Sequence, residues 1–256
     1  LWFANNPKDA YEEPTIKRSR SHNYVSKEVK NVRENVGVTE IANFSKHEFQ
    51  GPDARKFLDY VLAGRIPKPG RICLNPMLTP KGKLYGDLTV ACLNENKFMI
   101  FGSGAVQEMH RRWFESHLKN LNAVYKNRSD DFHGLALSGP KSRDLLQKLV
   151  RENISNENFK FRDVREMYVA GVPALVNRIS FTGELGYEVY VAPHFQLKLY
   201  EEMEVAGKEF NLKPFGSRAL MSMRLEKNWG AWTLDFRPDF TAKESGLDFF
   251  IDWKKN

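Results

Sequence analysis

Apolar residues recur at helical spacing in several stretches of the chain. Positions 25, 29, 32 and 36 are all valine, which predicts a helix over residues 26–35, with Ser26 as its N-cap and Gly37 just beyond its end. The same spacing predicts helices over 104–121, 196–210 and 216–227, and Ser217 is the expected N-cap of the last one.

Shorter apolar runs lie between these helices and predict strands. They cover two segments within 38–49, and then 84–93, 97–101, 161–169 and 173–180. Residues 176–191 predict a hairpin whose second strand places Tyr187, Val189 and Val191 on one face and Glu188 and Tyr190 on the other. Helices and strands alternate in mixed order with several hairpins, which predicts an α+β fold with antiparallel sheets rather than a doubly wound parallel sheet.

The dipeptide Gly-Pro stands twice between a strand and a helical segment. Gly51-Pro52 and Gly139-Pro140 lie 88 positions apart, and the following arginines, Arg55 and Arg143, and the apolar positions are in the same register. This predicts an internal repeat of a strand, Gly-Pro and helix unit. The alternative is coincidence, because Gly-Pro is common before a helix.

The turn of the predicted hairpin, residues 182–186, has Gly183 and Gly186 on either side of Glu184. Glycines allow a tight turn and a close approach of the backbone to a ligand. Taken alone, the pattern favours a solvated hairpin with a surface carboxylate, so a functional interpretation needs support from other segments.

Composition indicates an ordinary soluble globular protein. The chain has 256 residues, of which 41% are hydrophobic and 28% charged, and no apolar run approaches the roughly 20 residues of a membrane helix. Cys73 and Cys92 form no Cys-x-x-Cys motif, which indicates reduced, structural cysteines and a cytosol-like compartment, without a signal peptide. The first residue, Leu1, and the strand-like end indicate a piece of a longer polypeptide.

The net charge of +7 does not predict a nucleic-acid partner. Lysines and arginines are interleaved with acidic residues, and the densest group is only Lys17-Arg18-Ser19-Arg20. A basic surface equally suits a small anionic ligand. The histidines have no metal-binding spacing, so we expect no metal site, and no Gly-x-Gly-x-x-Gly or Walker A pattern predicts a nucleotide site.

Three segments together resemble the glycine-cleavage T-protein family of tetrahydrofolate-dependent aminomethyltransferases. They are Gly82-Lys83-Leu84-Tyr85-Gly86-Asp87-Leu88-Thr89-Val90, Phe181-Thr182-Gly183-Glu184-Leu185-Gly186-Tyr187-Glu188, and Gly216-Ser217-Arg218 running to Arg224-Leu225-Glu226-Lys227. The chain is more similar still to the folate-binding half of dimethylglycine and sarcosine dehydrogenases. That likeness rests on residues 33–38, 224–232, 237–238 and 244–248, and it covers nearly the whole chain from about residue 11.

The resemblance implies a fold of three domains around a central opening that holds the pterin, with two α+β domains followed by a small barrel. It implies a discontinuous folate-binding domain 1 over 1–50 plus 134–256, and an inserted α+β domain 2 over 51–133. The chain ends near the expected start of the C-terminal barrel, so we expect that domain to be missing from it, as is the flavin domain of the dehydrogenases.

The resemblance also implies the site residues. Asp87 matches the catalytic aspartate, and Glu184 matches the carboxylate that binds the amidine-like edge of the pterin. Arg218 is the expected contact of the folate glutamate tail, whereas Arg224, six positions on, is expected to pair with Glu226 or face solvent. Aromatic side chains that would line the pocket, or else belong to the core, are Tyr85, Phe181, Tyr187 and Trp232.

The implied function is transfer of a one-carbon unit from a methylated amine or glycine derivative to tetrahydrofolate, giving methylene-tetrahydrofolate. FAD is expected only in a separate or upstream flavoprotein domain or subunit, and the location is cytoplasmic, or the mitochondrial matrix in a eukaryote. One alternative is a non-catalytic folate-binding protein that assists iron–sulfur protein maturation; Asp87 and the lack of that branch's Lys-Gly-Cys motif count against it. The other is an RNA-binding domain, which only the charge favours.

Overall fold

The computed structural model describes residues 1–12 and 15–255, and the chain forms two compact units. Unit 1 comprises Leu1–Ile41, Gly134–Phe161 and Glu166–Trp229, and unit 2 comprises Ala42–His133, Arg162–Arg165 and Gly230–Asn256. The domain boundaries that the family likeness implies, 1–50 plus 134–256 and 51–133, stay a prediction.

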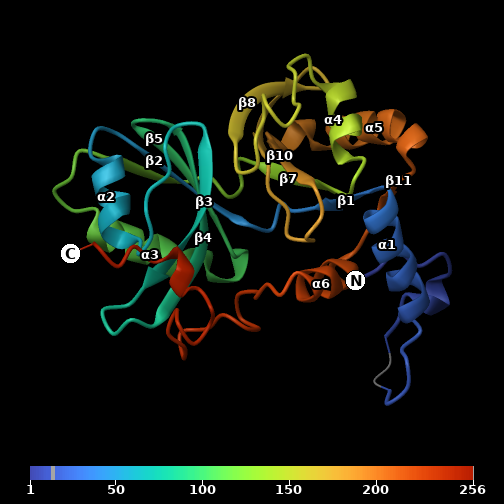
Figure 1. Ribbon diagram of the computed structural model, residues 1–256, viewed down its shortest axis with the longest axis horizontal. Helices are drawn as coiled ribbons and strands as arrows, with labels where there is room; N and C mark the ends of the chain where they lie inside the picture. Colours follow the sequence, from blue (N-terminus) through green and yellow to red (C-terminus); the bar gives the residue numbers. More distant parts are fainter. Residues whose placement is uncertain (13–14, 256) are drawn as a thin grey trace. The chain divides into compact units, whose positions relative to one another are not determined.

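Unit 1 is built on a six-stranded sheet in the order β11-β1-β7-β10-β9-β8 (Figure 1). The strands are β1 (Val36–Glu40), β7 (His133–Ser138), β8 (Val164–Val169), β9 (Val172–Asn177), β10 (Gly186–Val191) and β11 (Leu212–Pro214). The β1–β7 and β9–β10 pairs are antiparallel, and β1–β11 is parallel. Apolar residues of the sheet, of α4 (Ser142–Leu149) and of α5 (Gln196–Gly207) form its main core.

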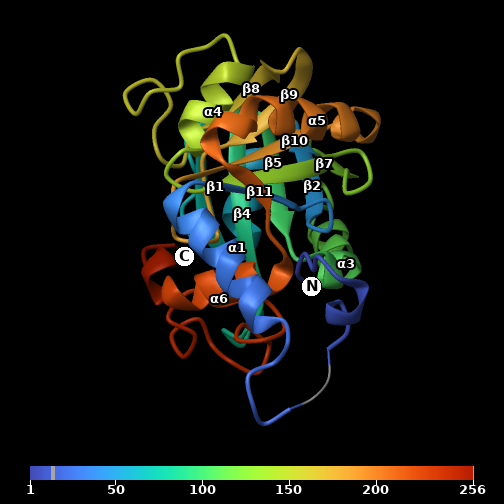
Figure 2. The same cartoon turned by 90° about the vertical axis from the view of Figure 1, so that its right-hand side faces the viewer.

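Two further helices of unit 1 lie side by side (Figure 2). They are α1 (His22–Glu34) and α6 (Ser217–Glu226), and they share a small core of Val32, Phe215, Ala219 and Met223. Glu28 of α1 accepts hydrogen bonds from the backbone N–H groups of Phe3 (2.7 Å) and Gly216 (2.8 Å), so one buried carboxylate joins the N-terminal segment to the start of α6.

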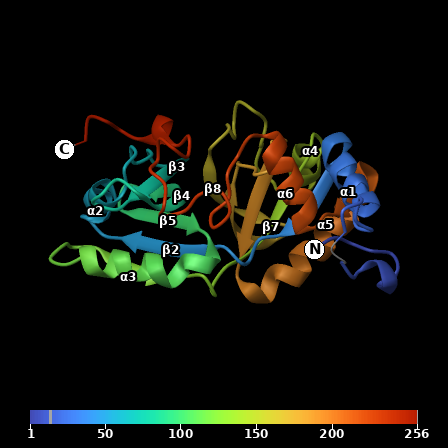
Figure 3. The ribbon, with the colours of Figure 1, turned by 90° about the horizontal axis from the view of Figure 1, so that it is seen from below.

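Unit 2 is built on a five-stranded sheet in the order β3-β4-β5-β2-β6. The strands are β2 (Ser45–Gln50), β3 (Arg71–Leu78), β4 (Leu84–Asn94), β5 (Lys97–Gly102) and β6 (Val124–Asn127), and the helices are α2 (Ala54–Val61) and α3 (Gln107–His117). α3 runs along β2 (Figure 3), where its Phe114 packs on His47 and Phe49, with ring centroids 5.2 and 5.0 Å apart. Short 3-10 turns complete both units at Pro7–Asp9, Gly104–Val106, Pro193–Phe195, Lys208–Phe210 and Asp248–Phe250.

The α+β fold with antiparallel sheets and helices is confirmed, and the described strands form no closed barrel. Two helix starts were wrong. α1 has Ser21, not Ser26, at its N-cap, and the added turn is held by Tyr24, whose hydroxyl donates to Asp9 (2.7 Å). α6 has Gly216, not Ser217, at its N-cap.

The two Gly-Pro units have the same backbone geometry, one in each compact unit. The φ angles of Gly51 and Gly139 are +139° and +132°, and a Cβ there would lie 2.5 and 2.4 Å from backbone oxygens. In both Gly-Pro units the backbone N–H of the third residue after the glycine, Ala54 or Ser142, donates to the glycine carbonyl at 3.0 Å. A helix begins at that residue. This shared geometry supports the predicted repeat.

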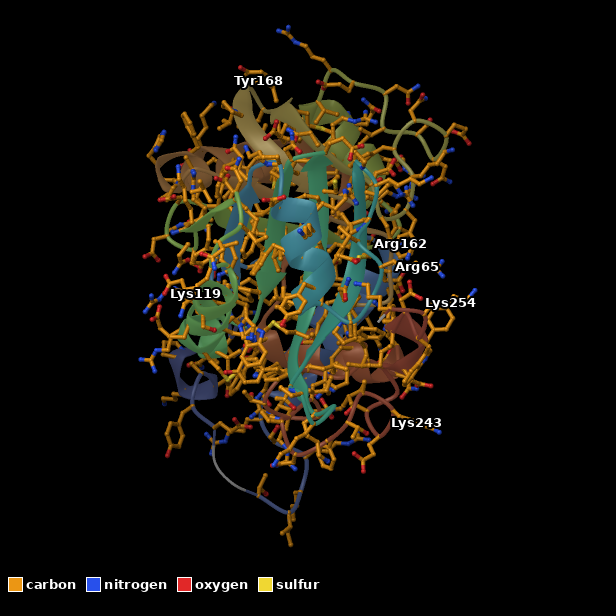
Figure 4. The ribbon with its side chains drawn as sticks, turned by 90° about the vertical axis from the view of Figure 1, so that its left-hand side faces the viewer. Arg65, Lys119, Arg162, Tyr168, Lys243 and Lys254 are labelled. Atoms are coloured by element: carbon orange, nitrogen blue, oxygen red, sulfur yellow. The ribbon has the colours of Figure 1, made fainter. Side chains whose placement is uncertain are left out.

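Long cationic side chains of unit 2 point outward from separate segments. Figure 4 shows Arg65, Lys119, Lys243 and Lys254 on four different parts of the chain, and Arg65 is paired with Asp252 at 2.9 Å. Across residues 1–12 and 15–255, no helix is both long enough and apolar enough to cross a membrane.

Candidate functional site

Asp87 lies on β4, at a place where that strand has a neighbour on only one side. β3 pairs with β4 along its length and places Pro76 opposite Asp87, whereas the pairing of β5 with β4 begins only at Thr89. The Asp87 side chain is therefore half-buried at the end of the sheet rather than covered by a strand. Burial raises the pKa of its carboxyl to about 7, against the opposing effect of a hydrogen bond from its own backbone N–H.

Aromatic side chains surround this end of β4 within unit 2. The half-buried Tyr85 ring lies 4.6 Å from Trp113 of α3, centroid to centroid. Trp232 is 8% exposed and contacts His110 of α3, with centroids 6.1 Å apart, so it belongs to the buried side of the cluster. Tyr85, two residues before Asp87, and Trp232 thus pack against α3 at this end of the unit 2 sheet.

Glu184 lies in the β9–β10 turn of unit 1, where Gly183 has a φ of +86°. Its carboxylate accepts a hydrogen bond from Arg33 of α1 at 2.7 Å. The same guanidinium donates to the Thr182 carbonyl (3.0 Å) and to Glu226 of α6 (2.6 Å), so one cation ties the turn to two helices. The sequence prediction for Glu184 did not include this partner, which lies 151 residues earlier in the chain.

Glu188, four residues further, is a site residue that the sequence prediction missed. Its half-buried carboxyl accepts a hydrogen bond from the Tyr190 hydroxyl (3.0 Å), and Asn177 lies opposite it in register on β9. Burial raises the pKa of the Glu188 carboxyl to about 7, while the hydrogen bonds from Tyr190 and Asn177 and the charge of Lys227 act the other way. The signal in the sequence was a carboxylate among the apolar and aromatic residues of the predicted strand 187–191.

A buried amide lies beside Glu188. The amide oxygen of Asn177, which has no exposed surface, accepts no hydrogen bond within the described residues, whereas the Asn177 side chain is hydrogen-bonded to the Glu188 carboxyl. Lys227, at the end of α6, donates to the Ser180 carbonyl at 2.8 Å, and burial lowers the pKa of its ammonium group. A ligand N–H group would supply the donor that the Asn177 oxygen lacks.

The two arginines of α6 have different surroundings. Arg218 pairs with Glu12, and its guanidinium lies 5.7 Å from the centre of the Trp2 ring. Arg224 is only 6% exposed and donates to the Trp229 carbonyl at 2.9 Å, so the expectation that it pairs with Glu226 or faces solvent was wrong. The segment after α6 folds back and covers Arg224, whereas Glu226 pairs with Arg33.

The aromatic residues of the hairpin differ in exposure. Phe181 is half-buried beside the turn. Tyr187 has no exposed surface, stacks on Phe159 with centroids 6.1 Å apart, and accepts a hydrogen bond from Arg143 at 3.2 Å. Tyr187 thus belongs to the core of unit 1, where it supports the strand that carries Glu188.

The chemistry available in each unit is that of a half-buried carboxyl that titrates near neutral pH. Such a group can hold or release a proton, bind adjacent N–H donors or stabilise a nearby positive charge. No group of three or more histidine, cysteine, aspartate or glutamate side chains able to hold a metal ion occurs in the described part of the chain.

Comparisons with known proteins match this chain along nearly its whole length. The model of the GCVT N-terminal domain family matches residues 1–255. Human mitochondrial dimethylglycine dehydrogenase is 35% identical over 257 residues, which cover 99% of this chain and 30% of that protein. An aminomethyltransferase of Desulfitobacterium hafniense is 30% identical over 235 residues, which cover 91% of this chain and 64% of that protein.

Solved structures share the fold. Glycine cleavage system aminomethyltransferase T from Bartonella henselae has a TM-score of 0.81 at 21% identity, and the match covers 91% of this chain and 62% of that one. A chain of the heterotetrameric sarcosine oxidase from Corynebacterium sp. U-96 has a TM-score of 0.56 at 16% identity, covering 77% of this chain and 97% of that one. The chain spans less than a third of the dimethylglycine dehydrogenase and about two thirds of the aminomethyltransferases.

Proposed function

The chain belongs to the family of the GCVT N-terminal domain, and from this premise we propose that it transfers a one-carbon unit to tetrahydrofolate. Family membership confirms the resemblance to the glycine-cleavage T-protein and to dimethylglycine and sarcosine dehydrogenases. These matches give no support to the non-catalytic alternative in iron–sulfur protein maturation. The observation that carries the proposal is the half-buried Asp87 carboxyl, whose pKa burial raises to about 7.

Asp87 is the proposed catalytic residue. Bound tetrahydrofolate supplies the nitrogen nucleophiles that accept the carbon unit. The ionised Asp87 carboxylate stabilises positive charge next to it, and its neutral form holds one proton on a carboxyl oxygen. A pKa close to the working pH lets both forms take part, which is the condition for efficient general acid–base catalysis.

The hairpin of unit 1 is the proposed binding site of the pterin. The buried Asn177 amide oxygen, which accepts no hydrogen bond in the described residues, fits a ligand edge that donates an N–H group. A carboxylate beside it suits two adjacent N–H donors. The family likeness assigns this role to Glu184, and we propose that Glu188 shares it, because Glu188 lies directly beside Asn177.

The other predicted site residues keep proposed roles that fit their surroundings. Arg218, whose partner Glu12 is an exposed carboxylate, is proposed to bind the folate glutamate tail by exchanging that carboxylate for one of the ligand. Tyr85 and Phe181, both half-buried, are proposed as pocket walls. Tyr187 is proposed to act from the core, by fixing β10.

The donor is proposed to be a methylated amine or a glycine derivative. The relatives named dimethylglycine dehydrogenase support the first class, and those named aminomethyltransferase support the second. A flavoprotein domain or subunit is the proposed partner and the place of any FAD, as the heterotetrameric sarcosine oxidase relative suggests. The mitochondrial dimethylglycine dehydrogenases make the mitochondrial matrix the proposed location for a eukaryotic source.

Replacement of Asp87 by asparagine tests the proposal, because it keeps the size of the side chain and removes its ionisable proton. The protein is used as it is encoded, with whatever sequence flanks this chain, and methylene-tetrahydrofolate is measured with each donor class. We expect the transfer rate of Asp87→Asn to fall at least about 100-fold, while the calorimetric Kd for tetrahydrofolate stays within about threefold. Asp130→Asn, an exposed position of the same unit, is the matched control.

Two outcomes would overturn the proposal. If Asp87→Asn transfers within a few-fold of the parent protein, the catalytic role of Asp87 is wrong. If titration with tetrahydrofolate gives neither heat nor a thermal shift, the folate site itself is wrong.

A further inference from the structure

His110 of α3 lies under the end of β4 that carries Asp87. It is 1% exposed, and its Nε2 lies 2.8 Å from the backbone carbonyl oxygen of Tyr85, two residues before Asp87. A neutral imidazole with its proton on Nε2 donates a hydrogen bond to that carbonyl.

This stretch of β4 has fewer strand hydrogen bonds than the rest of the sheet. The pairing with β5 starts at Thr89, so residues 84–88 have no strand neighbour on that side. On the other side the residue opposite Asp87 is Pro76, which has no N–H to donate and whose carbonyl accepts from Ala63 at 2.8 Å. At the start of this stretch the N–H of Leu84 donates to the Phe240 carbonyl at 2.9 Å, and the hydrogen bond from His110 holds the next carbonyl, that of Tyr85.

Gly86 lets the imidazole come this close. A Cβ on Gly86 would lie 3.0 Å from Nε2 of His110, so a larger residue would push the ring or the strand away. A glycine between Tyr85 and Asp87 also makes the backbone more flexible, so an anchor on the preceding carbonyl limits the freedom of Asp87.

The surroundings of the ring keep it neutral and in one orientation. His47 of β2 and Tyr85 of β4 are titratable side chains that face it, with ring centroids 6.2 and 6.3 Å from that of His110, and burial lowers the pKa of both histidines. Phe114 and Trp232 enclose the ring at centroid distances of 6.4 and 6.1 Å. Asp87 is the carboxyl that β4 carries next to this site. Burial, not a charged neighbour, is the main cause of its raised pKa.

We propose that His110 is a positioning residue for the reaction: its Nε2–H holds the Tyr85 carbonyl and thereby fixes the end of β4 that presents Asp87. The inference rests on the proposed catalytic role of Asp87. It predicts that loss of this one donor changes the surroundings and reactivity of Asp87 without removing folate binding.

The test compares two substitutions in the protein as encoded. His110→Gln keeps an N–H donor near the position of Nε2, and His110→Leu removes it at similar volume. We expect kcat to fall about tenfold or more in His110→Leu, with KM for tetrahydrofolate within about twofold, and to stay within about threefold of the parent in His110→Gln. His117→Leu is the matched control, because His117 lies on the same helix and its imidazole lies 2.8 Å from a carbonyl of its own helix, that of Trp113.

A second measurement does not depend on the reaction. Carbon-13 NMR titration of the Asp87 carboxyl is expected to show a lower pKa in His110→Leu than in the parent protein, because a looser strand admits water to the carboxyl. An unchanged pKa in a folded His110→Leu protein overturns the positioning role, as does an equal loss of kcat in both His110 substitutions. If His110→Leu does not fold, a loss of kcat in His110→Gln beyond about tenfold is the refuting result. The Asp87→Asn experiment, not this one, decides the catalytic role of Asp87.

Discussion

Replacement of Glu188 by glutamine is expected to stabilise the folded protein at pH 8 and to have almost no effect at pH 4. Glutamine keeps the size of the side chain and can still accept the hydrogen bond from Tyr190, but it has no charge to bury. The Glu188 carboxyl has its pKa raised by burial from the ordinary value of 4.5 to about 7. The folded state therefore binds the Glu188 proton more tightly than the unfolded state does.

The sign and the size of the effect follow from linkage. Below pH 4.5 the carboxyl is neutral in both states, so it costs nothing there. As the pH rises from 4.5 through 7 the unfolded state loses the proton first, and the free energy of unfolding falls. A difference of about 2.5 pKa units corresponds to about 3 kcal/mol, and because the side chain is half-buried this is an upper value.

Urea unfolding of the parent and the Glu188→Gln protein at pH 4 and pH 8 measures this directly. The expected result is a gain of about 2–3 kcal/mol at pH 8 and less than about 0.5 kcal/mol at pH 4. Glu201→Gln, an exposed position on α5, is the control and should change neither value. A Glu188→Gln protein whose stability differs from that of the parent by the same amount at both pH values would refute the argument. It would show that burial does not penalise the ionised form of Glu188.

Three further predictions concern the turn, the repeat and the ligand. Gly51→Ala and Gly139→Ala should each destabilise the fold by about 2–4 kcal/mol in urea melts, because a Cβ would meet backbone atoms at 2.5 and 2.4 Å. Gly70→Ala is the control: the space around Gly70 is open, so this substitution should cost less than about 2 kcal/mol. Arg33→Gln should increase amide hydrogen exchange over residues 182–185 and leave that of β4 unchanged, because the Arg33 guanidinium bonds the turn and Glu226 of α6; equal exchange in both proteins would contradict this. Glu188→Gln should weaken tetrahydrofolate binding at least about tenfold in calorimetry and Glu184→Gln by less, and the reverse order would assign the pterin to Glu184.

Local patterns predicted most of the strands and the faces of the hairpin, but not β3, β6 and β11. Tyr187, Val189 and Val191 all lie in the main core of unit 1, while Glu188 and Tyr190 share the other face and are hydrogen-bonded to each other. Alternation succeeds here because a strand can bury only one set of side chains in one core. The likeness to a known family then supplied Asp87, whose position on β4 no local pattern distinguishes from that of an ordinary strand aspartate.

Contacts between distant segments could not be predicted. Glu184 received its partner from α1, and the extra turn of α1 depends on a hydrogen bond from Tyr24 to Asp9. His110 looked like one of six scattered histidines until the structure placed it under Tyr85. Helix spacing gives the face of a side chain but not what that face meets, which depends on how the elements pack.

The two carboxylates of the hairpin differ in what a ligand must displace. At Glu184, pterin N–H donors would compete with a guanidinium already bonded at 2.7 Å, and a hydrogen bond between charged groups is worth about 1.5–3 kcal/mol. At Glu188 the bonded donors are the neutral Tyr190 hydroxyl and the neutral Asn177 amide, and the Asn177 oxygen accepts no hydrogen bond within the described residues. A ligand that binds Glu188 gains hydrogen bonds without breaking an ion pair. The Arg33–Glu184 pair also fixes the turn that precedes β10, the strand that carries Glu188.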